Sequence, residues 1–180
     1  MKKLLLFSVI LICLMACATK KQSIFTNLDC SKYSILDSLA YIEFPNEYDF
    51  YVEEVGLIQR KGNSIFHKIK NSNEKIIPCL IEKIKDTTYT NIIYADSYNY
   101  TYSDVSFFML EYTQSKQPIN INDILYEEFK KDFLKGNLFP FEQKIMIVFF
   151  TNDAQTNYNN RLRLYKRLKR WYLENYITKR

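Results

Sequence analysis

The sequence predicts a single all-α domain, and three observations support this prediction. Apolar residues recur at the helical spacing i, i+3, i+4 along most of the chain. Residues that cap helices, mostly asparagine, precede several of these segments. Hydrophobic residues make up 47% of the sequence, and only 3 glycines and 4 prolines occur in 180 residues, a composition typical of a globular protein rather than a disordered one.

Three helices are expected in the first part of the domain. Residues 31–44 show helical spacing, and Pro45 ends this segment. The second helix follows Asn46 and ends at Gly62, which fits the position just after a helix. A brief third helix begins after Asn63. The apolar face of the second helix comprises Tyr48, Tyr51, Val52, Val55 and Ile58.

The most regular helical pattern begins after Ser72 or Asn73. Glu74 is favourable in the first turn of a helix. Pro78 stands near the start, where proline disturbs a helix least, or else it kinks the helix. The apolar stripe of this helix comprises Ile76, Ile77, Leu80, Ile81 and Ile84.

This helix also carries a resemblance to known proteins. Residues 76–86 resemble one helix of a HEAT-type repeat. Residues 77–88, residues 104–110 and the pair Trp171–Tyr172 resemble stretches of uncharacterised bacterial lipoproteins. The resemblance implies an irregular HEAT-like helical array and no known active site. Because the stretch has no second copy, a regular solenoid is not expected.

Residues 85–102 lack a helical period and are predicted to form a long tyrosine-rich loop. Long loops in compact domains often carry function, and tyrosine suits protein or sugar surfaces. The candidate binding residues are Tyr94, Asp96, Tyr98, Tyr100 and Tyr102. The alternative is that these rings pack locally on the ends of the helices, as loop tyrosines often do.

Further helices are expected in the rest of the chain. Ser103 and Asp104 are predicted to cap a helix that runs through Tyr112. The next helix opens at Asn120 or Asn122. The apolar residues 145–150 are predicted to form a buried helix, although a buried strand would show the same pattern.

The last helix, expected from Asn159 or Asn160, combines an apolar face with many basic residues. The apolar face includes Leu168 and Trp171. The basic residues are Arg161, Arg163, Lys166, Arg167, Lys169 and Arg170. This charge pattern resembles a membrane-surface helix. The alternative, which is the usual case for an amphipathic helix, is a solvated outer face on a helix docked to its own domain.

The N-terminal segment has the features of a secretory signal. Lys2 and Lys3 precede an apolar run that is too short to span a bilayer. The sequence Leu-Met-Ala-Cys at residues 14–17 resembles the lipobox of bacterial lipoproteins. The resemblance implies a signal peptide over residues 1–16 and diacylation of the Cys17 thiol. An ordinary signal cleaved near Ala18 is the alternative.

These features predict the domain organisation and the location. A lipidated tether is expected at residues 17–28 and the helical domain at residues 29–180, in a bacterial cell envelope. No acid stands between Ala18 and Leu28, which favours a periplasm-facing anchor. The net charge of +5 falls to +3 when Lys2 and Lys3 leave with the signal, and this mild excess does not suggest nucleic acid. The expected partners are the membrane, through the lipid on Cys17, and a protein.

Two cysteines remain in the mature domain, Cys30 and Cys79. An oxidising envelope would permit one disulfide between them. A free thiol at Cys79, buried in a strongly apolar helix, is the alternative and is favoured over the bridge, because spacing alone does not show whether the two Cα atoms come within reach.

The sequence carries no recognisable catalytic motif. His67 is the single histidine, and it stands on a short lysine-flanked helix without a marked nucleophile. No cofactor or metal site is expected, since one histidine and two thiols make zinc ligation difficult.

The predicted function is therefore a non-enzymatic protein-interaction module: an adaptor, an assembly factor or an immunity-type binder. The alternative is a cell-envelope hydrolase whose two carboxylates are brought together by folding.

Overall fold

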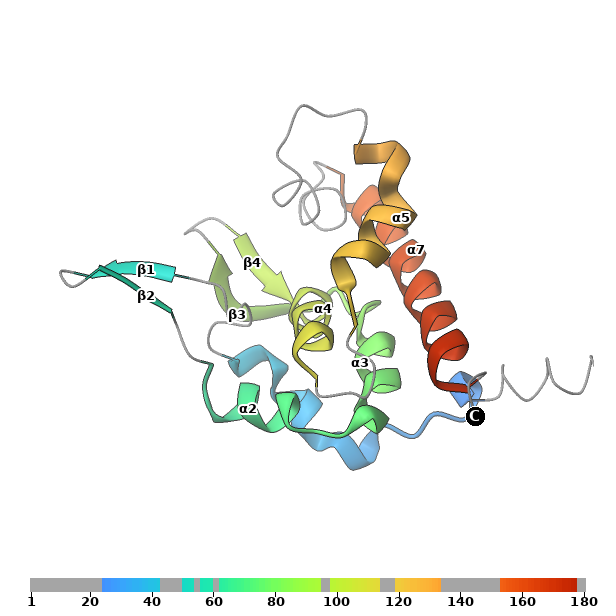
Figure 1. The fold of residues 1–180 in the computed structure, drawn as a ribbon, viewed down its shortest axis with the longest axis horizontal. Coiled ribbons are helices and arrows are strands. Elements are labelled where there is room, and N and C mark those ends of the chain that lie inside the picture. Colours follow the sequence, from blue (N-terminus) through green and yellow to red (C-terminus); the bar gives the residue numbers. More distant parts are fainter. Residues whose placement is uncertain are drawn as a thin grey trace, which may run out of the picture.

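The computed structural model describes residues 24–42, 50–53, 56–59, 62–94, 98–113, 119–133 and 153–177. Most of these residues are helical, which confirms the predicted mainly helical fold. Two antiparallel two-stranded hairpins, which the sequence analysis did not predict, accompany the helices (Figure 1). The expected lipidation site Cys17 and the expected helix at 145–150 lie outside the described residues.

The helices and strands follow one another in the order η1 (Ser31–Tyr41), β1 (Phe50–Glu53), β2 (Gly56–Gln59), α2 (Ser64–Lys70), η2 (Glu74–Ile76), α3 (Ile77–Lys83), β3 (Tyr89–Tyr94), β4 (Tyr98–Thr101), α4 (Tyr102–Tyr112), α5 (Ile121–Phe133), α7 (Ala154–Tyr172) and η3 (Leu173–Ile177). Elements η1 and η2 are 3₁₀ helices, and η3 is a π-helical turn that continues α7.

The core forms around α3 and α4. Every residue of α3 from Ile77 to Ile81 is buried, and so is every residue of α4 from Ser103 to Leu110. A helix that is buried on all sides has to lie inside the fold, and α3 packs against both α4 and α7. The predicted start of this region is confirmed, because the Asn73 side chain caps η2 and Pro78 lies in the first turn of α3.

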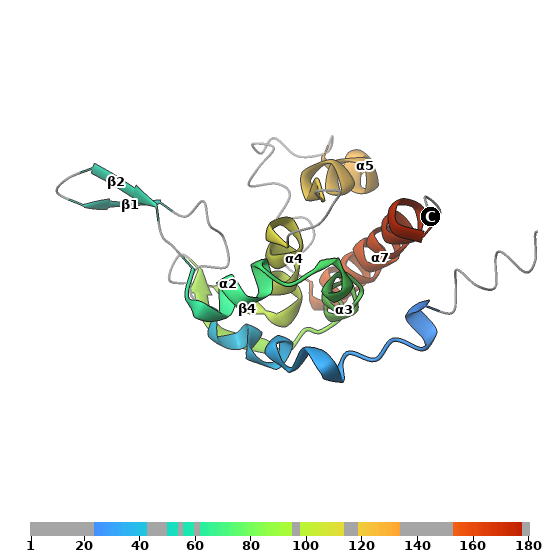
Figure 2. The same cartoon turned by 60° about the horizontal axis from the view of Figure 1, so that its bottom comes forward.

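The second predicted helix is wrong, because residues 50–59 form the β1–β2 hairpin. Its register pairs Val52 with Leu57 and Glu53 with Gly56. The aromatic and β-branched residues that fitted a helical face also have high strand propensity, and a local antiparallel pairing is the conformation adopted. Both views show this hairpin extending away from the helices (Figures 1 and 2). Gly62 does not end a helix. It allows the Phe66 ring to pack closely against the backbone, since a side chain at position 62 would collide with that ring.

Two helix starts differ from the prediction. Helix α4 begins after Thr101, whose hydroxyl accepts a hydrogen bond from the Asp104 backbone N–H, while the Asp104 carboxylate accepts one from the Thr101 N–H at 2.6 Å. This reciprocal capping box satisfies two backbone donors, whereas the Ser103 hydroxyl bonds elsewhere, to the carbonyl of Ile84. Helix α7 begins after Asp153, before either predicted asparagine. Hydrogen bonds to the Asp153 carboxylate, the first from the Thr156 hydroxyl, lower its pKa.

A disulfide ties the start of the chain to the core. Cys30, just before η1, is bonded to Cys79 in α3, with their Cα atoms 5.7 Å apart. The sequence favoured a free thiol at Cys79 over this pairing, and the structure shows instead that the bridge forms. Phe25, which falls within the expected tether, is buried edge-on against Tyr172 with ring centroids 5.8 Å apart. The packed part of the chain therefore includes residues before the disulfide.

Candidate functional site

The tyrosine-rich segment predicted as a loop is a β-hairpin, β3–β4, with a base fixed by hydrogen bonds. The Asp86 carboxylate accepts a bond from the Thr88 N–H, and the Thr88 carbonyl accepts one from Tyr102. The Asp86 carbonyl accepts a third bond, from the N–H of Ser103. Because the chain enters and leaves the hairpin through these bonds, its base is held against the start of α4.

The two faces of the hairpin differ in burial. On the inner face, Thr90 is buried and donates a hydrogen bond to the carbonyl of Tyr100 at 2.8 Å. On the outer face, Tyr89 is 68% exposed and Ile93 is 62% exposed, with the exposed Asn91 between them. The β3–β4 pairing shifts register between Tyr89 and Ile93, so the regular alternation of a strand is interrupted there. The exposure of Tyr89, Asn91 and Ile93 nevertheless shows that these three residues form a solvent-facing row.

The structure separates the residues predicted to bind together. Tyr100 is 3% exposed and packs edge-on against Phe108, so it belongs to the core. Tyr102 begins α4, half-buried, and its hydroxyl donates a hydrogen bond to the Asp37 carbonyl at 3.3 Å. The backbones of Tyr94 and Tyr98 pair at the end of the hairpin. Asp96 and the side chains of Tyr94 and Tyr98 lie outside the described residues, so their role stays a prediction.

Sequence reasoning missed the most exposed apolar residues of this segment, Tyr89 and Ile93. No hydropathy signal marks them, because the sequence Tyr-Thr-Asn-Ile-Ile at residues 89–93 does not alternate between apolar and polar residues, and the polar Thr90 is buried while Ile93 is exposed. Tyr41, at the end of η1, is also 63% exposed, and η1 packs against β3. The exposed rings of Tyr41 and Tyr89 therefore come from neighbouring elements.

A pocket lies beside the disulfide. Its volume is about 340 Å³, and its apolar lining includes the Cys30–Cys79 bridge, Tyr33 and Leu36. Its charged lining residues are Asp37, Glu82, Lys83, Lys85 and Asp86. The pocket thus combines an apolar floor with side chains of both signs.

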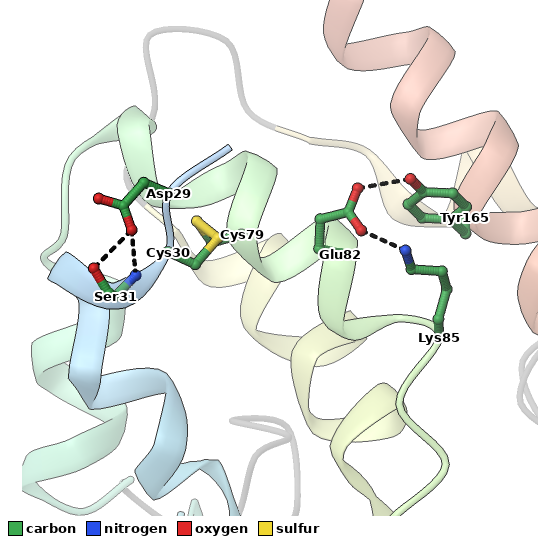
Figure 3. Close-up of a disulfide and its surroundings, with 7 residues drawn as sticks. All are labelled: Asp29, Cys30, Ser31, Cys79, Glu82, Lys85 and Tyr165. Atoms are coloured by element: carbon green, nitrogen blue, oxygen red, sulfur yellow. Dashed lines mark hydrogen bonds and ion pairs between the residues drawn. A yellow bond between two sulfur atoms is a disulfide. The ribbon is translucent and has the colours of Figure 1, made fainter. Parts of the chain in front are cut away.

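Glu82, one of the acids of this pocket, bonds to two side chains (Figure 3). One carboxylate oxygen accepts a hydrogen bond from the Tyr165 hydroxyl at 2.6 Å, and the other lies 2.5 Å from the Lys85 ammonium. The same ammonium stands 4.4 Å from the centroid of the Tyr165 ring. Burial raises the pKa of Tyr165, and the hydrogen bond to Glu82 raises it further. This cluster connects α3 to α7 through charge-assisted bonds.

The basic residues of α7 are not a uniform solvated face. Arg161 is 3% exposed, with one guanidinium nitrogen 2.5 Å from the Thr101 hydroxyl and another 3.3 Å from the Asp104 carboxylate. Asp104 is 1% exposed, so the ion pair is buried. It joins α7 to the junction between β4 and α4.

Two further arginines of α7 face α5. Arg163 lies 2.7 Å from the carboxylate of Glu128, and Arg167 lies 2.6 Å from that of Glu127. Arg163 also donates to the backbone carbonyl of Glu128. The adjacent acids Glu127 and Glu128 therefore fasten one helix to another.

The described part of the chain offers few other features that would indicate catalysis or metal binding. His67 is exposed on α2. Within the described ranges, no three His, Cys, Asp or Glu side chains come together as metal ligands. No helix among the described residues is both long and apolar enough to cross a membrane. Comparison with protein-family profiles, curated proteins and solved structures found no match.

Proposed function

We propose that the protein is a lipid-anchored protein of a bacterial cell envelope that acts by binding another protein, without catalysis. The lipid on Cys17 would hold it at a membrane, and the outer face of β3–β4 would contact the partner. The observation that carries the proposal is the exposed row Tyr89–Asn91–Ile93 on a hairpin whose base is fixed.

Three physical arguments support this contact surface. Large side chains that combine apolar area with a polar tip contribute much of the energy at protein interfaces, and Tyr89 is of this kind. A recognition segment held by a rigid scaffold loses little entropy on binding. A two-stranded sheet also offers its edges to an extended segment of a partner. An irregular HEAT-like array remains our proposal for the scaffold, and the packing of α3 against α4 and α7 supports it.

The hydrolase alternative receives less support from the pocket. Such an enzyme needs two carboxyl groups that act on a bound sugar. Glu82 is paired with Lys85 and Tyr165, and Asp86 lies 3.5 Å from Lys83. Both carboxylates are therefore engaged in ion pairs within the fold rather than left to act on a bound sugar, and this favours the binding function over hydrolysis.

The proposed contact between the outer face of the hairpin and a partner can be tested by replacing Asn91 with a photo-crosslinking amino acid. In intact cells, the probe should form a discrete adduct with a partner protein. The double substitution Tyr89→Ser and Ile93→Ser should abolish the adduct and leave the melting temperature nearly unchanged, because exposed substitutions usually alter stability by less than about 0.5 kcal/mol. Immunoblotting of the tagged protein measures the adduct.

A matched control keeps this experiment specific. Tyr126 and Tyr158 are exposed on α5 and α7, outside the outer face of the hairpin, and Tyr126→Ser with Tyr158→Ser should retain the adduct. An adduct of equal yield in the Tyr89→Ser and Ile93→Ser variant would exclude this face as the contact.

Lipidation is expected at Cys17 and nowhere else in the signal region. A clickable fatty-acid probe should label the wild-type protein, and Cys17→Ala should lose the label because the acylated thiol is gone. Cys13→Ala provides the control, since Cys13 lies in the segment that is expected to be removed. Labelling that persists in Cys17→Ala would contradict the anchor.

A further inference from the structure

The C-terminal half of α7 and the turn η3 lie beside the first described residues of the chain. Phe25 packs against Tyr172, and the Lys169 ammonium stands 4.7 Å from the centroid of the Phe25 ring. Ile24 and Leu28 also pack on the core, half-buried. The first described residues of the chain are therefore held, through Phe25, against this end of α7 (Figure 1).

The length of chain between the lipid and this docked segment is short. Seven residue steps separate Cys17 from Ile24. Fully extended, they span at most about 25 Å. The following inference rests on the proposed lipid anchor. If the lipid on Cys17 holds the protein at a membrane, the membrane surface has to lie within about 25 Å of Ile24, which is next to the end of α7.

At this end, α7 carries two exposed basic residues, and η3 continues them with two apolar residues that pack in part against the core. Lys166, Arg170, Leu173 and Ile177 recur at helical spacing, and we call them the anchor-side stripe. Lys166 and Arg170 are exposed and form no ion pair with the described residues, in contrast to Arg163 and Arg167. Leu173 and Ile177 are half-buried.

Most of the charges near the stripe are positive. Lys169 flanks it, and Lys20 and Lys21 lie in the sequence between the lipidation site and Ile24. Glu174 contributes one negative charge at this end. A basic surface with apolar side chains at its margin is complementary to an anionic lipid surface.

We propose that the anchor-side stripe contacts the surface of anionic phospholipids in the membrane that carries the lipid anchor. The contact orients the domain. Figures 1 and 2 show β3–β4 on the opposite side of the molecule from the C-terminal end of α7, so the hairpin would lie on the side of the domain away from the bilayer. The lipid anchor fixes the protein to the membrane, and the stripe fixes which side faces it.

The chain offers a direct reporter for this contact, because Trp171 is the single tryptophan. In a Trp171→Phe background, Leu173→Trp places a tryptophan in the stripe, and Lys68→Trp places one on α2 as a control. The lipidated full-length mature proteins are reconstituted in vesicles that contain brominated phosphatidylcholine with or without phosphatidylglycerol. Bromine quenches tryptophan only at close range. Quenching of the introduced tryptophan is expected at position 173, stronger with phosphatidylglycerol, and not at position 68.

Two charge variants test whether the basic residues cause the contact. Lys166→Glu with Arg170→Glu should remove the quenching at position 173. The loss of two basic residues alone corresponds to about 25-fold in the contact equilibrium, at about fivefold for each charge near an anionic surface. Lys68→Glu with Lys75→Glu makes the same change in net charge on other exposed residues and should retain the quenching.

The outcomes separate this inference from the proposed function. A protein that fails to float with vesicles lacks the anchor, and the inference falls with it. A protein that floats but shows no quenching at position 173 overturns the inference and leaves the anchor standing. Equal quenching with and without phosphatidylglycerol, or equal loss in both charge variants, would also overturn it.

Discussion

Replacing both Cys30 and Cys79 with alanine is expected to lower the free energy of unfolding by about 4 kcal/mol. The bridge joins residues 49 positions apart in the sequence. In the chain-entropy account, a loop of this length removes about that much conformational free energy from the unfolded state. Urea unfolding of the oxidised wild type and the double variant measures the difference. In a domain of this size, the melting temperature should fall by roughly 8–16 °C.

Reduction provides the control for the disulfide prediction. Wild type unfolded in the presence of a thiol reductant should match the double variant to within about 1 kcal/mol, because both lack the cross-link and keep the other core contacts. The double variant itself should not respond to the reductant. A difference below about 1 kcal/mol between oxidised wild type and the variant would contradict the prediction.

The parts of the fold that the sequence predicted are those that local interactions determine. The caps at Asn63 and Asn73 use side chains next to the helices they start, and both are present in the structure. The apolar stripe of α3 is buried as expected. Helix periodicity and capping are short-range properties, so a single sequence reveals them.

The two hairpins and the disulfide depend on information that local patterns do not contain. Tyr51, Val52 and Ile58 fit a helical face and a strand equally well, and the pairing partner decides between them. The Cys30–Cys79 bridge depends on η1 packing beside α3, which no spacing rule specifies. For such features, tertiary contacts determine the local structure.

The candidate site was predicted in part. The sequence singled out residues 85–102 as unusual, but the interpretation as a loop placed buried and exposed tyrosines together. Tyr100 lies in the core, so a substitution there would test folding rather than binding. Arg161 was grouped with a basic outer face, although it stands three residues before the buried Leu164 and seven before the buried Leu168, on the same stripe.

Removing the carboxylate of Asp104 is expected to destabilise the domain by about 3–5 kcal/mol. Asp104→Ala would leave the Arg161 guanidinium, which is 3% exposed, without the carboxylate that lies 3.3 Å away. Breaking one side of a buried ion pair typically has this cost, since the remaining charge stays desolvated. The substitution also removes the acceptor for the Thr101 N–H in the capping box. Urea unfolding at neutral pH measures the loss.

Asp123 offers a matched control, because it occupies the third position of α5 as Asp104 does in α4, but it is exposed. Asp123→Ala should cost about 1 kcal/mol or less. Arg161→Met combined with Asp104→Ala should recover part of the stability, since an apolar replacement of a buried pair is often tolerated. If Asp104→Ala costs no more than Asp123→Ala, the buried pair does not stabilise the fold. If the predicted loss is found, the Asp104–Arg161 pair contributes to holding the junction between β4 and α4 against α7.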